Sequence, residues 1–124
     1  MPDSSLYSSL SGYTETRPWG KFVVLLDVST SKVKQITVMP GQRLSLQLHH
    51  QREEHWVITQ GHGVVTVGEE ERTVKPGDYV FIPKETRHRI ANTGSEPILF
   101  IEVQLGSYFG EDDIVRFQDD YNRQ

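Results

Sequence analysis

The sequence contains no cysteine among its 124 residues. Disulfide-stapled scaffolds, thiol nucleophiles and cysteine-based zinc sites are therefore excluded. Any metal that the chain binds must be held by histidine nitrogen or by oxygen from carboxylates, amides or the backbone. A chain of this length buries roughly two thirds of the surface that its unfolded form exposes, so it needs no disulfide to fold as one domain.

The sequence also lacks a long apolar run and an excess of positive charge. No stretch approaches the roughly 20 apolar residues needed to cross a bilayer, and the N-terminus has neither the basic nor the apolar region of a signal peptide. Seventeen acidic residues outnumber thirteen basic ones and give a net charge of −4, whereas nucleic-acid binders depend on cations that pair with phosphates. We therefore expect a cytoplasmic protein that binds neither nucleic acid nor a membrane.

Short apolar runs rich in β-branched residues recur along the chain. They cover residues 22–26, 33–38, 44–48, 56–59, 64–67, 79–82 and 98–103. Turn sequences separate them, including Pro40-Gly41 and Pro76-Gly77, in which proline presets φ and glycine accepts a positive φ. Short strands at such regular spacing predict an antiparallel sandwich or barrel. We interpret residues 1–16, which are rich in serine and have no clear period, as an N-terminal arm, and residues 17–124 as one domain.

A group of metal-ligating residue types stands out within this pattern. On a strand that runs on to His49, Gln47 and His49 are two residues apart and project from the same face. A short polar turn brings Glu54 back to this neighbourhood, and His88 begins a later strand. An amide oxygen, two imidazoles and a carboxylate that converge in a barrel suit a divalent first-row metal ion. Coordination positions left open on such an ion permit catalysis.

The spacing of these residues resembles the two sequence motifs of the cupin superfamily. The residues that match the first motif are Gly41, Gln47, His49, Glu54 and Gly61, and those that match the second are Gly77, Pro83, His88 and Asn92. Two positions depart from the general pattern, since Gln47 replaces the usual first histidine and Glu85 replaces the usual glycine. The resemblance implies an all-β fold, the antiparallel double-stranded β-helix or jelly-roll barrel of the cupins.

A narrower resemblance covers residues 17–123, nearly the whole chain. The segments that carry it are Arg17-Pro18-Trp19-Gly20, Pro40-Gly41, Leu44-Ser45-Leu46-Gln47, His49, Arg52, Glu54-His55-Trp56, Ile82-Pro83, His88-Arg89, Glu102-Val103-Gln104 and Gly110-Glu111-Asp112-Asp113-Ile114-Val115-Arg116-Phe117. Together they resemble the type II mannose-6-phosphate isomerase domain, in which glutamine normally holds the first ligand position. In many relatives this domain follows a nucleotidyltransferase that makes GDP-mannose. That domain needs a glycine-rich nucleotide loop and a longer chain, so we do not carry its activity over.

The resemblance implies a metal-dependent aldose–ketose isomerase that interconverts mannose 6-phosphate and fructose 6-phosphate through an enediol-type intermediate. The ligands that it implies for one divalent ion, which is Zn, Co, Mn, Ni or Fe, are Gln47, His49, Glu54 and His88. The base must lie within hydrogen-bond reach of the moving proton. The candidates for this base are Glu54, His55 and Glu102. Arg52 joins Glu54 and His55 as a candidate catalytic residue.

The phosphate of such a substrate needs cations, and guanidinium groups bind its oxygens in pairs. We favour Arg52 and Arg89 for this role, and the further candidates are Lys21, Lys84 and Arg17. Strand parity raises an objection to Arg89, because a neighbour of an inward-pointing His88 points outward unless a bulge intervenes. Arg52 lies in a turn and escapes that objection.

Two other functions remain open from the sequence. One is an iron-dependent cupin oxygenase, which open coordination positions on the metal permit. The other is a non-catalytic sugar-phosphate-binding cupin, since a fold by itself licenses no function. For partners, we expect a phosphosugar substrate and a second copy of the chain, because a jelly roll leaves an exposed sheet edge that a second subunit often covers.

Overall fold

The computed structural model describes residues 13–121, which form eleven β-strands and no helix. The strands are β1 (Tyr13–Arg17), β2 (Gly20–Asp27), β3 (Lys32–Val38), β4 (Leu46–Leu48), β5 (Arg52–Gln60), β6 (Gly63–Val67), β7 (Glu70–Val74), β8 (Tyr79–Ile82), β9 (His88–Ala91), β10 (Ile98–Gly106) and β11 (Val115–Gln118). Every pair of neighbouring strands is antiparallel. The prediction of an all-β antiparallel fold is confirmed. Within residues 13–121 there is accordingly no helix with the length and apolarity that crossing a membrane requires.

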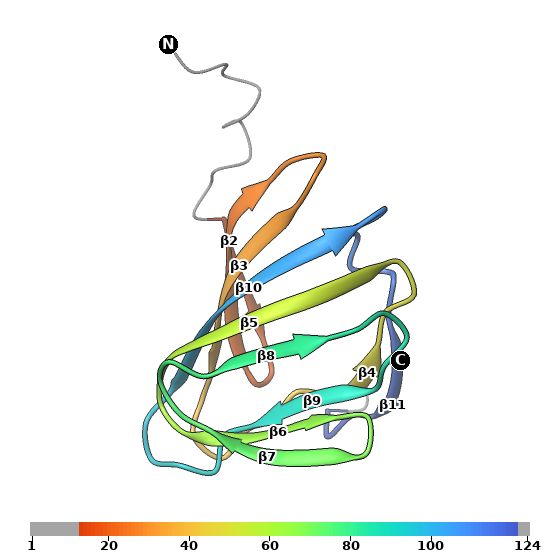
Figure 1. The fold of residues 1–124 in the computed structure, drawn as a ribbon. Coiled ribbons are helices and arrows are strands. Elements are labelled where there is room, and N and C mark those ends of the chain that lie inside the picture. Colours follow the sequence, from red (N-terminus) through yellow and green to blue (C-terminus); the bar gives the residue numbers. More distant parts are fainter. Residues whose placement is uncertain (1–12, 122–124) are drawn as a thin grey trace.

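The strands form two sheets that face each other across a common interior (Figure 1). The larger sheet has the strand order β1-β2-β3-β10-β5-β8, and the smaller one has the order β11-β4-β9-β6-β7. Strands that are distant in sequence, such as β3 and β10, are neighbours in the larger sheet because the chain crosses repeatedly between the two sheets. This arrangement is a jelly-roll barrel.

The interior of the barrel is apolar at one end and charged at the other, as the two central strands of the larger sheet show. Both β5 and β10 alternate buried and more exposed residues, so each points every second side chain inward. In the apolar half these inward residues are Trp56, Ile58, Ile98 and Phe100. In the polar half they are Arg52, Glu54, Glu102 and Gln104. The packed apolar half therefore adjoins the cluster of buried polar groups along the same two strands.

One aromatic contact anchors the apolar half beside the polar one. The rings of Trp56 and Phe100 lie 4.5 Å apart between their centroids. Such pairs contribute about 0.5–1.5 kcal/mol beyond the burial of their area. Glu54 and Trp56 are successive inward-pointing residues of β5. The packing of Trp56 against Phe100 therefore also holds the strand in place at Glu54, where the polar cluster begins.

Backbone conformation at the turns agrees with the predicted turn chemistry. Gly41 and Gly77, each of which follows a proline, have φ angles of 77° and 93°. The predicted positive φ of both glycines is confirmed. Among the described residues Glu85 is the one non-glycine residue with positive φ, at 59°, and it occupies the position where the general cupin motif has glycine. Left-handed backbone costs an ordinary residue roughly 1–2 kcal/mol. The Glu85 N–H donates to the His49 carbonyl at 2.7 Å, which ties the turn before β9 to the end of β4.

All seven predicted apolar runs lie in strands or overlap them, whereas β1, β7 and β11 were not predicted as strands. β1 and β7 carry polar residues on both faces, so they have little period-two signal to read. β11 does alternate, with the apolar Val115 and Phe117 at every second position, but it has only four residues and these apolar side chains are exposed. Residues 13–16, which the sequence assigned to an arm, lie in β1 and pair with β2. The remainder of that predicted arm lies outside the described residues.

Candidate metal and substrate site

Three residues from different parts of the chain converge in the polar half of the barrel. His49 directly follows β4, Glu54 lies on β5, and His88 is the first residue of β9. One ligand atom from each lies within 4.8 Å of the others, and all three side chains are buried. Pairing of β4 with β9 brings the two histidine strands together, and the facing sheet supplies the carboxylate. The convergence predicted for these three residues is present in the fold.

Both imidazoles turn the same nitrogen toward Glu54. The Nδ1 atoms contact backbone carbonyls, at 2.6 Å from the Asp113 oxygen for His49 and at 2.9 Å from the Thr86 oxygen for His88. A carbonyl only accepts, so each Nδ1 carries a proton and Nε2 is the nitrogen left to face the interior. The Nε2 of His49 also lies 3.3 Å from Nη2 of Arg52. The Nε2 atoms lie 3.2 Å (His49) and 3.9 Å (His88) from the Glu54 carboxylate.

This donor set fits a divalent metal ion. The buried Nε2 of His88 has no hydrogen-bond partner among the described residues, and a buried acceptor of this kind needs a partner. Metal-binding histidines commonly donate their other N–H to a carbonyl, as His49 and His88 do. Two neutral imidazole nitrogens and a carboxylate suit first-row divalent ions.

The protonation states agree with that interpretation. Burial lowers the pKa of His88 to about 4, so its imidazole is neutral near pH 7. Burial alone raises the pKa of Glu54, but its contacts with His49, Arg52 and His88 more than offset this and hold the pKa well below its usual value. The group therefore offers a carboxylate and an uncharged His88 nitrogen at neutral pH.

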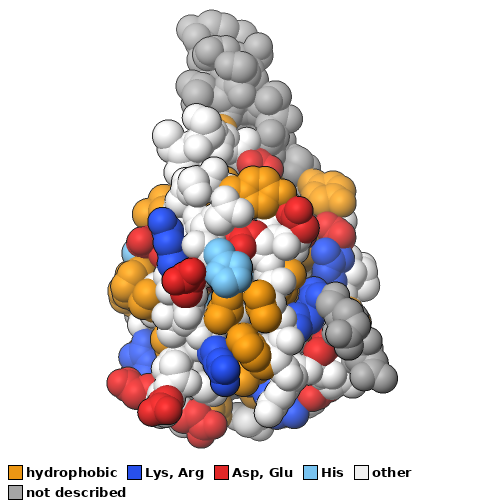
Figure 2. All heavy atoms as spheres, turned by 90° about the vertical axis from the view of Figure 1, so that its right-hand side faces the viewer, with side chains coloured by type: hydrophobic (Ala, Val, Ile, Leu, Met, Phe, Trp, Pro, Cys, Tyr) orange, Lys and Arg blue, Asp and Glu red, His pale blue; other side chains and the backbone are white. Residues whose placement is uncertain are grey.

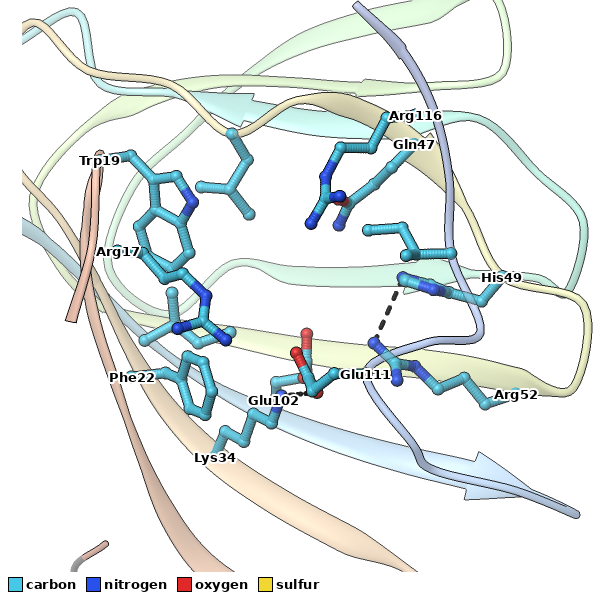
Figure 3. A pocket seen from close by; sticks show the side chains of 13 residues that line it. Arg17, Trp19, Phe22, Lys34, Gln47, His49, Arg52, Glu102, Glu111 and Arg116 are labelled. Carbon is cyan, nitrogen blue, oxygen red and sulfur yellow. Dashed lines mark hydrogen bonds and ion pairs between the residues drawn. The ribbon is translucent and has the colours of Figure 1, made fainter. Parts of the chain in front are cut away.

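Gln47 lies beside this group. It pairs with His88 in the β4–β9 register, and its side chain points into a pocket that His49 also lines (Figure 3). The Gln47 Oε1 accepts a hydrogen bond of 2.8 Å from the Ser45 hydroxyl. Its role as a fourth ligand stays a prediction.

Two side chains hold Glu54 in place. Oε2 accepts from the Arg52 guanidinium at 2.9 Å, and Oε1 accepts from the Trp56 indole N–H at 3.0 Å. Arg52 is only 5% exposed, and its Nη1 has no hydrogen-bond partner among the described residues. Arg52 therefore positions Glu54 while keeping one donor available to an anion.

We expect Trp56→Phe to weaken metal binding about 10-fold, because loss of the indole N–H frees one oxygen of Glu54 to rotate, and such supporting contacts are typically worth 10- to 100-fold in metal affinity. Competition with a chelator of known affinity measures the change. Trp19→Phe is the matched control, since Trp19 is a buried aromatic residue of the same pocket that makes no bond to Glu54. Equal losses in both variants would show that the hydrogen bond is irrelevant.

The pocket opens beside the three-residue group, and its cavity has a volume of about 60 Å³. Trp19 and Phe22 form an aromatic wall (Figure 3). The charged side chains that line it are Arg17, Lys34, Arg52, Glu102, Glu111 and Arg116. A polar pocket with cations and an aromatic wall suits a small anionic ligand.

Glu102 is a second buried carboxyl group at this pocket, separate from the His49–Glu54–His88 group. It is 4% exposed, and its Oε1 accepts a hydrogen bond of 2.6 Å from the Gln104 amide. Burial, together with the neighbouring charge of Glu54, raises the pKa of Glu102 to about 8. A carboxyl group whose pKa lies near working pH is suited to proton transfer.

Four residues that the sequence proposed for the site lie away from this pocket, and strand parity explains three of them. Lys21, His55 and Arg89 each adjoin an inward-pointing residue and therefore project outward. No bulge interrupts β9, whose register with β6 is regular around Arg89. Lys84 lies exposed in the turn after β8.

The outward residues have other partners. The Arg89 guanidinium donates to the Leu44 carbonyl and to Gln118 on the outside of the smaller sheet. The His55 imidazole bonds Glu53 and the Tyr79 hydroxyl, both at 2.6 Å, on the outside of the larger sheet. Neither residue reaches the pocket from its side of the sheet.

The sequence did not single out Lys34, Glu111 or Arg116 as site residues, although all three line the pocket. For Lys34 a signal exists, because it shares strand parity with Ile36 and Val38, both buried. A lysine at an inward position of a strand must meet a partner inside the barrel. Glu111 precedes β11, and its place at the pocket depends on how that loop folds back.

Comparison with known proteins places these features in context. The family model described as "Mannose-6-phosphate isomerase C-terminal" matches residues 9–119. The xanthan biosynthesis protein XanB of Xanthomonas campestris pv. campestris is 49% identical over 107 residues, which cover 86% of this chain and 23% of that protein. A mannose-1-phosphate guanylyltransferase of Escherichia coli is 44% identical over 107 residues, with the same shares covered, 86% and 23%. The chain thus spans about a quarter of the length of these curated relatives.

The fold also matches solved structures. A Klebsiella pneumoniae protein with a double-stranded β-helix domain superimposes with a TM-score of 0.69 and 22% identity, covering 78% of this chain and 83% of that one. At that identity the likeness establishes the fold alone. The predicted cupin architecture is confirmed.

Proposed function

The chain belongs to the mannose-6-phosphate isomerase C-terminal family, and we propose that it interconverts mannose 6-phosphate and fructose 6-phosphate. The observation that carries the proposal is the juxtaposition of a buried His–Glu–His group, a separate buried carboxyl at Glu102 and a cation-lined pocket. Aldose–ketose isomerisation needs these three elements: polarisation of the sugar oxygens, a proton-transfer group and an anchor for the phosphate. The other activities of the longer relatives are not part of this proposal.

His49, Glu54 and His88 would hold a divalent metal ion, with the Gln47 amide oxygen as the proposed fourth donor. Bound there, the ion would supply Lewis-acid polarisation of the sugar oxygens at C1 and C2. Its identity among Zn, Co, Mn, Ni and Fe is set by cellular supply as much as by these ligands.

Glu102 is the residue that we assign to proton transfer. Of the three candidate bases, His55 projects from the outside of the sheet, and both oxygens of Glu54 accept hydrogen bonds from Arg52 and Trp56. Glu102 lines the pocket and keeps one oxygen that Gln104 does not use. In the forward direction the ionised form of Glu102 removes the proton from C2 of mannose 6-phosphate and returns it to C1. One proton also passes from O2 to O1, so that the C1 aldehyde becomes an alcohol and the C2 alcohol becomes a ketone.

Arg52 binds an oxygen of the substrate through the Nη1 donor that its contact with Glu54 leaves available. Because Arg52 stays paired with Glu54, its guanidinium is held rigidly and loses little freedom when it binds. The remaining pocket cations attract the dianionic phosphate.

The decisive experiment measures turnover of mannose 6-phosphate by protein loaded in turn with each candidate divalent metal. Turnover with at least one metal is the expected result, and no turnover with any of them would overturn the proposal. Oxygen uptake with candidate substrates would instead favour the iron-dependent oxygenase. A shift of thermal stability by sugar phosphates without turnover would favour the non-catalytic binding protein.

We also propose that the chain forms a homodimer through the outside of the larger sheet. On β5 and β8 the side chains of Val57, Tyr79 and Phe81 are 45%, 50% and 43% exposed. A cluster of apolar side chains on a sheet face marks an interaction surface. At the edge of the larger sheet, the Tyr79 carbonyl of β8 already accepts a hydrogen bond from Arg72. We therefore expect the second copy to pack on the outer face of this sheet and not to pair with its edge strand.

Phe81→Asp is expected to convert the dimer to a monomer, as measured by light scattering during gel filtration, because the new carboxylate would be buried without a partner. Phe117→Asp on β11 serves as the control, since Phe117 is 40% exposed on the other sheet. A wild-type chain that elutes with monomer mass would refute the dimer.

A further inference from the structure

The loop between β10 and β11 forms part of the pocket wall, and two of its residues contact other parts of the site. Near its end, the Asp113 carbonyl accepts from His49, and the Asp113 carboxylate accepts from the backbone N–H groups of His50 and Gln51 at 3.0 Å and 2.9 Å. Two residues earlier, Glu111 extends into the pocket (Figure 3). The loop is thus fixed at Asp113 and places a carboxylate among the pocket cations.

Lys34 is the cation that Glu111 meets. Its Nζ lies 2.6 Å from the Glu111 carboxylate and 4.0 Å from the centre of the Phe22 ring. Lys34 is 3% exposed as a residue, whereas the Glu111 side chain is 45% exposed. The lysine is therefore a fixed part of the barrel wall, and the carboxylate is the member of the pair that can leave.

The electrostatics around Glu111 favour negative charge. Burial alone raises the pKa of Glu111, but Lys34, Arg52 and Lys32 outweigh it and lower the pKa below its usual value. Arg17 and Arg116 line the same pocket. A phosphate dianion carries more charge and more oxygens than a carboxylate, so it binds this set of cations more strongly.

We propose that Lys34 binds the substrate's phosphate and that Glu111 is the carboxylate which the phosphate displaces from it. The proposal rests on the function proposed above and names the residue pair that selects for a phosphorylated sugar. A sugar without phosphate brings no anion to Lys34 and leaves the Lys34–Glu111 pair in place. The Lys34–Glu111 pair thereby discriminates against neutral sugars, because a ligand must carry an anion to displace the Glu111 carboxylate from Lys34.

Isothermal titration of the full chain with inorganic phosphate and with mannose 6-phosphate tests the exchange. Lys34→Met should weaken both affinities about 10- to 100-fold, the usual loss for a hydrogen bond to a charged group. Glu111→Gln should tighten both by about 3- to 10-fold, because it removes the competitor while preserving shape. In the double variant the Glu111→Gln gain should vanish, because the two residues act on each other.

Two further variants separate this exchange from a structural role. Asp112→Asn changes the neighbouring carboxylate, which accepts from Tyr108 on the same loop, and should leave both affinities unchanged. Lys34→Arg keeps the cation and should retain binding if Lys34→Met fails to fold. Unchanged phosphate affinity in Lys34→Met, or weaker phosphate binding in Glu111→Gln, would overturn the proposal.

Binding and turnover report on different claims. If phosphate affinities change as expected and no metal supports turnover, the isomerase function fails and the anion exchange stands. If the wild-type chain isomerises mannose 6-phosphate and Lys34→Met retains its KM, the exchange fails and the isomerase function stands.

Discussion

Glu102→Gln is expected to reduce turnover of mannose 6-phosphate by about 10²- to 10⁴-fold, the contribution typical of a well-placed acid or base. Glutamine has the shape of glutamate and can still accept the hydrogen bond that Gln104 donates to residue 102. It cannot take up a proton. The loss should therefore appear in kcat, and exchange of the C2 proton of the substrate with solvent should fall in parallel.

The control for this experiment is a matched substitution away from the pocket. Glu70→Gln, on the exposed start of β7, should retain wild-type turnover. Metal content of Glu102→Gln should equal that of the wild-type chain, since Glu102 is not among the proposed ligands. Retention of more than about a tenth of wild-type kcat would remove Glu102 from the role of base.

His88→Ala is expected to lower metal affinity by more than about 100-fold, beyond the effect of changing a residue that merely supports a ligand. The substitution deletes one of three donors, and its buried Nε2 has no other described partner. Elemental analysis after dialysis against a weak chelator should find close to one ion per chain in the wild-type protein and almost none in the variant. The metal-dependent rise in thermal stability should disappear as well.

The matched control is His62→Ala, which removes an exposed histidine from a turn and should keep its metal. His49→Ala provides a second test in case the cavity at residue 88 prevents folding. Full metal retention by either folded ligand variant would exclude the His49–Glu54–His88 group as the metal site.

The strand pattern shows how far local sequence determines this fold. Residues 79–82 were predicted as a strand, and β8 has those bounds. Alternating side chains and Pro-Gly turns act between neighbours in sequence, so both can be read without coordinates. β7 was missed because its residues are polar on both faces, and β11 because its alternation covers only four residues. Both strands form by pairing, β7 with β6 and β11 with β4.

Some site residues could also be predicted from the sequence pattern, whereas others could not. The convergence of His49, Glu54 and His88 could be predicted because the motif spacing fixes where each strand begins, although metal binding itself stays a prediction. Arg89 and His55 were proposed for the site from their residue type. Their outward direction follows from the parity of the strands that carry Glu54 and His88 inward.

The class of the fold, its turns and the three donor side chains could be predicted without coordinates, since each depends on spacing along the chain. Glu102 was already a candidate base from the sequence, but only the folded chain shows that it shares the pocket with Lys34 from β3 and Glu111 from the loop before β11. These residues are distant along the chain, and they meet only through the register of β3 with β10 and the fold of that loop over the barrel. Contacts of this kind depend on closure of the whole barrel, which no local pattern encodes.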